Sequence, residues 1–338
     1  MPKLRCEGPV IVKVVFLQEL NPRTVEHFRQ RCPAHELVFP QTQDVAALAA
    51  AAAGADVLVG YRLPQAVADA APGLKAFLTG AAGVDRTVSE SLAGRTSVQV
   101  GNSHANALDV AEHALALAMD AAKLVSRGDR DLRRGDWTLR YDDVPGGLLT
   151  GKTALIVGYG AIGAALAKLL SGFRMTLLGV RRGAAAGEPD DLGVRTVALM
   201  DGLPLADFVF IFAPLTPQTK GLIGQEQIAA MRPSAILVNV SRGPVVQEDP
   251  LFEALAARRI AAAGLDVWYV YPKGGVDVRS TFPSRRPFHD LPNVVLSPHR
   301  ASYTERMHTE QWDDVVENIE RVARGEPVKY AVDLEAGY

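Results

Sequence analysis

The chain has 338 residues, 48% of them hydrophobic and 22% charged, and a formal net charge of −2. This composition is typical of a globular protein with enough apolar material for two cores of about 150 residues each. Basic residues are scattered and no run approaches the ~20 apolar residues of a membrane-spanning helix, which excludes a nucleic-acid surface and a membrane protein. The two cysteines, Cys6 and Cys32, have no metal-ligand spacing, so we expect no metal site, no disulfide scaffold and a cytoplasmic location.

The first hundred residues alternate short β-branched runs with helical patterns. Such alternation predicts right-handed crossovers and a parallel sheet, which forms a first domain. Asp44 is a suitable N-cap for the second helix of this region. The predicted strands are 10–17, 36–39, 56–60, 74–78 and 98–100, and the predicted helices are 24–31 and 44–53.

A second alternation of strands and helices follows a long helix predicted at 107–125. Its strand-like runs are continuously apolar, which is typical of strands buried on both faces. The polar stretch 127–151 has no clear periodicity and is interpreted as a connector, and an amphipathic helix is predicted at 304–324 with Gly325 as its C-cap. The strands of this second domain are predicted at 154–157, 176–180, 208–212, 236–240, 262–267 and 294–296.

The segment Gly158-Tyr-Gly160-Ala-Ile-Gly163 follows one of these buried strands and opens a helix, which is the context of a dinucleotide-binding loop. The first glycine permits the tight turn and the second lets a pyrophosphate approach the backbone. The third allows close packing of helix on strand, and the helix N-terminus attracts the anion.

A ribose-binding acid is expected at the end of the next strand, about 20 residues further on. Eighteen residues after Gly163 the chain instead carries Arg181 and Arg182. Two guanidiniums suit the 2′-phosphate of NADPH through charge-assisted hydrogen bonds, and the alternative is a pair of solvated arginines. NADP is therefore the favoured cofactor, with NAD possible.

Further segments resemble the D-isomer-specific 2-hydroxyacid dehydrogenase family, whose relatives include phosphoglycerate, glyoxylate/hydroxypyruvate, formate and phosphite dehydrogenases. They occur in the family's order: GAAGVD (80–85), VAEHALAL (110–117), GDW (135–137), GKTALIVGYGAIG (151–163), FAPLTPQTKGLI (212–223), LVNVSRGPVV (237–246), GLDVW (264–268) and NVVLSPHRAS (293–302). The resemblance implies an α/β fold of two doubly wound parallel-sheet domains. A Rossmann cofactor domain, 106–299, is inserted into a flavodoxin-like substrate domain made of 1–105 and 300–338.

The resemblance also implies the reacting residues. Arg242 matches the arginine that holds the substrate carboxylate and polarises its carbonyl, a task suited to a planar, permanently charged fork. His299 matches the general acid/base, whose pKa near neutrality suits proton transfer. Asp266 matches an acid near the nicotinamide carboxamide, with a strand-end cap as the alternative.

Substrate contacts are implied at the backbone amides of Ala82 and Gly83 and at Asn106, and His104 in the same loop either faces the cleft or lies in solvent. The remaining histidines, His27, His35, His113, His289 and His308, are interpreted as structural or solvated. Besides the glycines, the two arginines and Asp266, the implied cofactor contacts are Tyr159, Ala161, Ile162, Ala213, Pro214, Thr219 and Val240.

The sequence departs from the family at one position of consequence. The family usually has a glutamate five residues after the GLDV aspartate, where it bonds the catalytic histidine, and here that position is Tyr271. Formate dehydrogenases also lack the glutamate but have glutamine there. The following segment, 272–287, is long and basic, and its Arg279, Arg285 and Arg286 either form a solvated loop or meet an anionic substrate.

The function indicated is hydride transfer between NAD(P)H and a small, anionic 2-oxo or D-2-hydroxy acid. One alternative is a dehydrogenase of formate or another oxyanion, for which the glutamate is dispensable. Another is a non-catalytic NAD(P)-sensing interaction protein, against which the intact Arg242 and His299 argue. Family resemblance implies a homodimer; the sequence gives neither the substrate nor the physiological direction.

Overall fold

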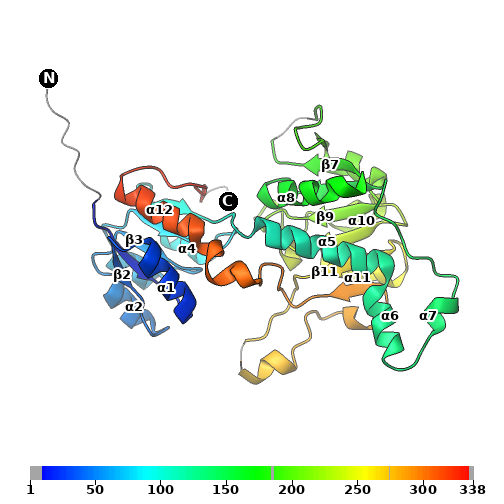
Figure 1. Cartoon of the computed structure of the whole chain (residues 1–338), viewed down its shortest axis with the longest axis horizontal. Coiled ribbons are helices and arrows are strands. Elements are labelled where there is room, and N and C mark those ends of the chain that lie inside the picture. The colour runs from blue at the N-terminus through cyan, green and yellow to red at the C-terminus, as the bar shows by residue number, and fades with distance from the viewer. Residues whose placement is uncertain (1–9, 184–185, 274, 335–338) are drawn as a thin grey trace. The chain divides into compact units, whose positions relative to one another are not determined.

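The computed structural model describes residues 10–183, 186–273 and 275–334, so Cys6 lies outside the described residues. The chain divides into two compact units. We call Met1–Asn106 with Tyr303–Tyr338 the five-stranded unit, and Ala107–Ser302 the seven-stranded unit (Figure 1). No helix among the described residues is long and apolar enough to cross a membrane.

The five-stranded unit has a parallel sheet of order β2-β1-β3-β4-β5, which is the flavodoxin-like doubly wound order. One face of the sheet is covered by α1 and α12, and the other by α2, α3 and α4. The strands are β1 (Lys13–Phe16), β2 (Glu36–Val38), β3 (Val57–Val59), β4 (Ala76–Leu78) and β5 (Gln99–Gly101). The helices are α1 (Pro22–Arg31), α2 (Val45–Ala52), α3 (Gln65–Ala70), α4 (Arg86–Ser91) and α12 (Asp313–Ala323), with 3-10 turns at Glu305–His308 and Glu310–Trp312.

The seven-stranded unit has a parallel sheet of order β12-β11-β10-β9-β6-β7-β8, in which β6 to β11 follow the Rossmann order. Helices α5 and α8 pack on one face, and α10 and α11 on the other. The strands are β6 (Thr153–Val157), β7 (Thr176–Val180), β8 (Val194–Thr196), β9 (Phe208–Ile211), β10 (Ile236–Asn239), β11 (Ala262–Leu265) and β12 (Val294–Leu296). The helices are α5 (Ala107–Lys123), α6 (Val125–Leu132), α7 (Thr138–Tyr141), α8 (Ala161–Leu170), α9 (Leu199–Gly202), α10 (Gln225–Ala230) and α11 (Glu248–Ala256), and the 3-10 turns are Ser171–Phe173, Leu203–Leu205, Gly243–Val245, Gly275–Arg279 and Phe288–Asp290.

The predicted fold class is confirmed, because both sheets are parallel and doubly wound. The predicted Asp44 cap is also confirmed, since its carboxylate accepts the backbone N–H of Ala47 at 2.9 Å. The predicted strands all exist, and β7 and β12 have the predicted bounds. Most of the others pair only part of the apolar run that predicted them, as β1 does with four residues of the run 10–17. Strand β8 was not predicted, because a three-residue edge strand carries little apolar signal.

The connector predicted at 127–151 is wrong in part, since it contains most of α6 and all of α7. Leu124 has a left-handed backbone (φ 60°), which ends α5 and starts a new helix in another direction. Helix α6 buries no residue, and only Val125 and Leu132 of its eight residues are large and apolar, so its sequence gives little apolar signal. Local carboxylate–guanidinium pairs such as Asp129–Arg133 hold it instead.

The helix predicted at 304–324 begins nine residues late, at Asp313. The residues before it form two short 3-10 turns, separated by Thr309 with φ −135° and ψ −85°. The predicted end is confirmed: Gly325 has φ 69°, and the next amide, of Glu326, donates to the carbonyl of Arg321.

Candidate active site and dinucleotide site

The glycine loop joins β6 to α8 at the point where the order of the seven-stranded sheet reverses. In open α/β sheets, ligands bind at the carboxyl ends of the strands beside this point. Gly158 has φ 91°, and a Cβ there would lie 2.4 Å from the backbone nitrogen of Ala213. A Cβ on Gly163 would lie 2.9 Å from Ile156, whereas one on Gly160 would meet nothing within 4 Å. The three glycines therefore fit a tight turn, helix–strand packing and an open approach for a pyrophosphate.

The other predicted cofactor contacts lie near the same edge of the sheet. Ala161 and Ile162 form the first turn of α8, and Val240 directly follows β10. Ala213 follows β9, and its backbone N–H donates to the carbonyl of Val157 at 3.1 Å. The hydroxyl of Thr219 donates to the carbonyl of Pro214, which closes the loop after β9.

Arg181 and Arg182 directly follow β7 and are both exposed. An acid that the sequence analysis missed also lies in this region. The hydroxyl of Tyr159, in the glycine loop, donates to Asp190 at 2.6 Å, and Asp190 also accepts the amides of Leu192 and Val194. Asp190 is 27 residues after Gly163, too far along the chain for the usual ribose-acid spacing to identify it.

The turn after β10 presents Arg242. The side-chain oxygen of Asn239 accepts both the amide and the hydroxyl of Ser241, and its NH2 donates to the carbonyl of Arg242 at 3.2 Å. A Cβ on Gly243 would lie only 2.2 Å from the carbonyl oxygen of Trp268. This position therefore requires glycine, and it brings the turn that carries Arg242 against the segment that leads to Tyr271.

The structure brings Tyr271 and His299 together, with 2.9 Å between the phenol oxygen and Nδ1. The backbone N–H of Trp268 donates to the same phenol oxygen at 3.1 Å, so the phenol O–H is available to donate to Nδ1. Burial raises the pKa of Tyr271 above its usual value, which keeps it a neutral phenol. Desolvation and the charge of Arg242 lower the pKa of His299, while the charge of Asp266 acts to raise it.

Asp266 lies at the end of β11, and its side chain is 0% exposed. It accepts the hydroxyl of Ser297 and the amides of Arg300 and Ala301, at 2.8 and 2.9 Å for the amides. Although burial acts to raise it, the pKa of Asp266 is lowered by hydrogen bonds from His113, Ser297 and these amides. The carboxylate is therefore ionised inside the protein. The cofactor role assigned to Asp266 from the sequence stays a prediction.

In the five-stranded unit, Ala82 and Gly83 follow β4. The carbonyl of Ala81 accepts the amide of Ser103, and the carbonyl of Ala82 accepts the side-chain NH2 of Asn102 at 2.7 Å. Within the part of the chain that the structure describes, the amides of Ala82 and Gly83 donate to no protein group. Hydrogen-bonded carbonyls and free amides fit a loop that receives a carboxylate. Asn102, which holds this loop through the carbonyl of Ala82, is a residue that the sequence did not predict.

The two other predicted residues of this unit differ in environment. Asn106 is buried, and its side-chain oxygen has no hydrogen-bond partner among the described residues. His104 stacks on Tyr330, with 4.0 Å between ring centroids, and its backbone amide donates to Asp314. Burial lowers the pKa of His104. The ring is therefore packed against the C-terminal segment, which neither interpretation of His104 from the sequence anticipated.

The basic segment that follows Tyr271 is anchored within its own unit. Arg285 pairs with Glu248 at 3.1 Å, and Arg286 pairs with Asp249 at 2.7 Å and with Glu253 at 3.4 Å. These carboxylates all lie on α11. Of the two interpretations left open, the pairs favour a loop held to the protein surface for Arg285 and Arg286.

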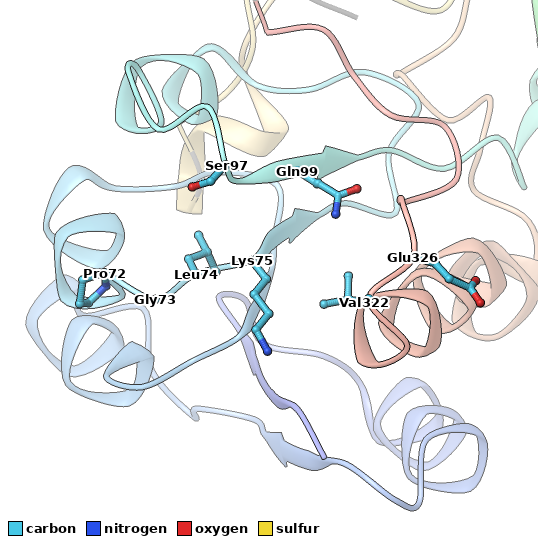
Figure 2. Close-up of a pocket in the computed structure, with 9 residues that line it drawn as sticks. Pro72, Gly73, Leu74, Lys75, Ser97, Gln99, Val322 and Glu326 are labelled. Carbon is cyan, nitrogen blue, oxygen red and sulfur yellow. The ribbon is translucent and has the colours of Figure 1, made fainter. Parts of the chain in front are cut away.

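A hollow of about 390 Å³ lies in the five-stranded unit, where β4 and β5 begin (Figure 2). It is lined by Leu74, Lys75, Ser97 and Gln99, with Val322 and Glu326 of the C-terminal segment. None of the predicted site residues lines it. It lies at the amino ends of the strands, whereas doubly wound folds bind ligands at the carboxyl ends. No group of histidine, cysteine, aspartate and glutamate in the described residues could hold a metal ion.

Comparison with known proteins identifies the family. Residues 115–301, more than half of the chain, match the profile described as D-isomer specific 2-hydroxyacid dehydrogenase, NAD binding domain. The chain belongs to the D-isomer specific 2-hydroxyacid dehydrogenase family. The resemblance noted in the sequence is thereby confirmed.

Three relatives illustrate the range of this 2-hydroxyacid dehydrogenase family. A glyoxylate reductase of Korarchaeum cryptofilum is 34% identical over 297 residues, which cover 87% of this chain and 84% of the relative. A D-3-phosphoglycerate dehydrogenase of Methanocaldococcus jannaschii is 33% identical over 83% of this chain, which spans only 52% of that protein. The crystal structure of a D-isomer specific 2-hydroxyacid dehydrogenase from Xanthobacter autotrophicus, in complex with NADPH and MES, has a TM-score of 0.78 and 26% identity, and covers 97% of this chain and 100% of its own.

The first two glycines of the loop provide a matched pair of variants. Gly158→Ala forces a Cβ into the backbone at Ala213 and an L-residue into positive φ. We expect it to lower the free energy of unfolding by about 2–4 kcal/mol in urea denaturation. Gly160→Ala meets no neighbour, so we expect stability within about 1 kcal/mol of wild type but weaker NADPH binding in a fluorescence titration. Normal NADPH affinity in Gly160→Ala would show that no ligand approaches this backbone.

Proposed function

We propose that this protein is an NAD(P)-dependent oxidoreductase that transfers a hydride between a nicotinamide dinucleotide and a small 2-oxo or D-2-hydroxy acid. The observation that carries the proposal is the 2.9 Å contact between Tyr271 and His299, in the same unit as the glycine loop and beside the turn of Arg242. The glyoxylate reductase among the relatives supports the substrate class. Because the chain spans about half of the phosphoglycerate dehydrogenase it matches, that relative's substrate is not carried over.

The bound dinucleotide supplies or accepts the hydride, and the chain's own residues bind the substrate and move the proton. Arg242 binds the carboxylate and stabilises negative charge on the reacting oxygen, as its charged fork allows. His299 Nε2 gives the proton to that oxygen in reduction and removes it in oxidation. Tyr271 fixes the ring from the Nδ1 side. The amides of Ala82 and Gly83, held by Asn102, receive the substrate carboxylate.

We assign the substrate domain to 1–105 with 300–338 and the cofactor domain to 106–299. The cofactor domain binds the dinucleotide at the glycine loop, with Asp266 near the nicotinamide. NADPH is the preferred cofactor, because Arg181 and Arg182 follow β7 and because the Xanthobacter relative binds NADPH. We place the protein in the cytoplasm, in line with its free thiol at Cys32.

We further propose a homodimer formed through the arm α6–α7. This arm buries none of its own side chains, and it exposes large apolar ones, with Trp137 61% and Tyr141 81% exposed. Val125, Leu132, Val144 and Leu148 are exposed in the same stretch. So many large apolar side chains exposed in one stretch favour an interaction surface, and a second copy of the chain is the occupant that the family membership favours.

Two observations favour a second candidate, the oxidation of formate or another small oxyanion. Tyr271 is a neutral phenol at the position where the family resemblance implies a glutamate, and the buried Asn106 has a side-chain oxygen without a partner among the described residues. A panel of 2-oxo acids, D-2-hydroxy acids and formate, run with NADPH and NADH and followed by nicotinamide absorbance, decides between the two. Turnover of formate alone would overturn the leading proposal, and dinucleotide binding without turnover of any panel member would favour a sensor.

The cofactor preference is testable at Arg181. We expect wild type to bind NADPH more tightly than NADH, because each charge-assisted contact to the phosphate contributes about 1.5–3 kcal/mol before desolvation. Arg181→Asp removes one contact and repels the phosphate, so the ratio of dissociation constants should reverse in favour of NADH. Arg174→Asp, on an exposed turn of the same unit, is the charge-matched control. Equal or tighter NADH binding by wild type would contradict the preference.

The anchoring role is testable at Arg242. Arg242→Lys keeps the positive charge but loses the planar fork, so we expect kcat/KM for the best 2-oxo acid to fall by ~100-fold or more. The dissociation constant for the dinucleotide should change little, because the glycine loop is untouched. Near-normal turnover by the lysine variant would mean that another residue binds the substrate carboxylate.

The proton-transfer role is testable through pH. Reduction needs a protonated His299, and its pKa is lowered by desolvation and by Arg242, so kcat/KM for reduction should fall as pH rises through a value below about 6.5. Oxidation needs the neutral ring and should rise over the same range. Tyr271→Glu adds a carboxylate beside the ring, which raises the pKa of His299 and should move both limbs to higher pH.

Tyr271→Phe is the control, since it removes the hydrogen bond and adds no charge. The pH at which its kcat/KM for reduction falls should be no higher than that of wild type. A deuterated cofactor establishes that the pH profile reports the chemical step. This role for the pair would be contradicted if kcat/KM for reduction by wild type fell only above about pH 8 and Tyr271→Glu did not change that pH.

A further inference from the structure

His299 has a backbone conformation that L-residues rarely adopt, with φ 56°. The two amides that follow it, of Arg300 and Ala301, both donate to Asp266, one to each carboxylate oxygen. Successive amides after a left-handed residue form a concave anion-binding turn, and a buried carboxylate in that turn stabilises it. The charge of Asp266 therefore holds the backbone that presents the imidazole of His299.

The hydrogen bonds of Asp266 lead to a second histidine. Ser297 has one hydroxyl proton, which it donates to Asp266, so it must accept from His113, whose Nε2 lies 2.9 Å from the Ser297 oxygen. The same His113 nitrogen is 3.3 Å from Asp266. The N–H of His113 therefore points at both groups, and His113 carries its proton on Nε2.

His113 is distinct from the other partners of Asp266 because it comes from another element. Ser297, Arg300 and Ala301 belong to the single segment after β12, whereas His113 lies on α5, a helix of 17 residues that packs on β10, β11 and β12. It therefore ties the proton-transfer segment to the main helix of that face of the sheet. Its ring is partly exposed, so an apolar side chain of similar size would fit there.

We propose that His113 is a positioning residue for His299, acting through Ser297 and the buried carboxylate of Asp266. This inference rests on the proposed function in one respect, namely that His299 transfers the proton. Without the His113 N–H, the hydroxyl of Ser297 is free to rotate and Asp266 loses a donor. The turn at 299–301 then relaxes, and His299 leaves the geometry that proton transfer requires.

The experiment uses the full chain and combines kinetics with histidine side-chain NMR. His113→Leu removes the donor, and His113→Gln returns an N–H near the position of Nε2. The matched control is His289→Leu, an exposed histidine of the same unit that stacks on Phe282. His299→Gln identifies the ring resonances of His299 in the unliganded protein.

We expect His113→Leu to shift the His299 resonances and to lower kcat by about 10-fold or more, with the KM for the dinucleotide within about twofold of wild type. His113→Gln should recover most of the loss, and His289→Leu should match wild type. Ser297→Ala should act in the same direction, and the double variant with His113→Leu should be no worse than the worse single change, because the two act as one unit.

Unchanged His299 resonances and unchanged kcat in His113→Leu would overturn the inference, as would full additivity in the double variant. If His113→Leu does not fold, Ser297→Ala and His113→Gln decide by the same two measurements. If His299→Gln keeps normal turnover, the proposed function fails instead, and the His299 resonances alone then show whether His113 positions that ring.

Discussion

A buried, ionised carboxylate is the interaction on which the reacting part of this protein depends. Asp266 is removed from water at the end of β11, where an unpaired charge would cost several kcal/mol. The cost is offset because the carboxylate collects a hydroxyl and two backbone amides from one short segment. The turn at His299, the contact with α5 and the ionisation of Asp266 are therefore one structural arrangement.

Trp268 connects this arrangement to two neighbouring turns. Trp268, two residues after Asp266, donates its backbone N–H to Tyr271 and approaches Gly243 so closely that only glycine fits. The seven-stranded unit thus holds the glycine loop, Arg242, Tyr271 and His299 on the carboxyl side of one sheet. At the carboxyl side of its own sheet, the five-stranded unit has a loop whose carbonyls accept hydrogen bonds from Asn102 and Ser103.

The sequence was sufficient for the fold class because buried parallel strands are continuously apolar and are separated by helical periods. It was insufficient where stability does not come from an apolar face. Helix α6 buries no residue, and β8 is a short edge strand. Helix α12 begins only after Thr309, whose backbone angles interrupt the helical conformation. In each case the deciding factor was a local backbone angle or a pairing partner far away in the chain.

The same distinction applies to the candidate site. Gly158, Arg242 and His299 stand in motifs, Tyr271 is located by its spacing from another motif, and a motif is a local pattern. His113 and Ser297 are 184 residues apart, and Tyr159 and Asp190 are 31 apart, so only the folded chain brings these pairs together. His113 was interpreted as structural or solvated because a helical histidine has no local signal of what its ring contacts.

Trp268 also makes the site observable. Its backbone N–H is bonded to Tyr271, its indole N–H donates to the carbonyl of Ser297 at 2.8 Å, and its ring packs edge-on against Phe288. The indole of Trp268 is therefore bonded to the segment that leads to His299, and the backbone of the same residue is bonded to Tyr271. The other tryptophans are Trp137, which is exposed on the arm, and Trp312 in the five-stranded unit. With those two replaced, the tryptophan emission of this chain would come from Trp268 alone and would report on the surroundings of Ser297, two residues before His299.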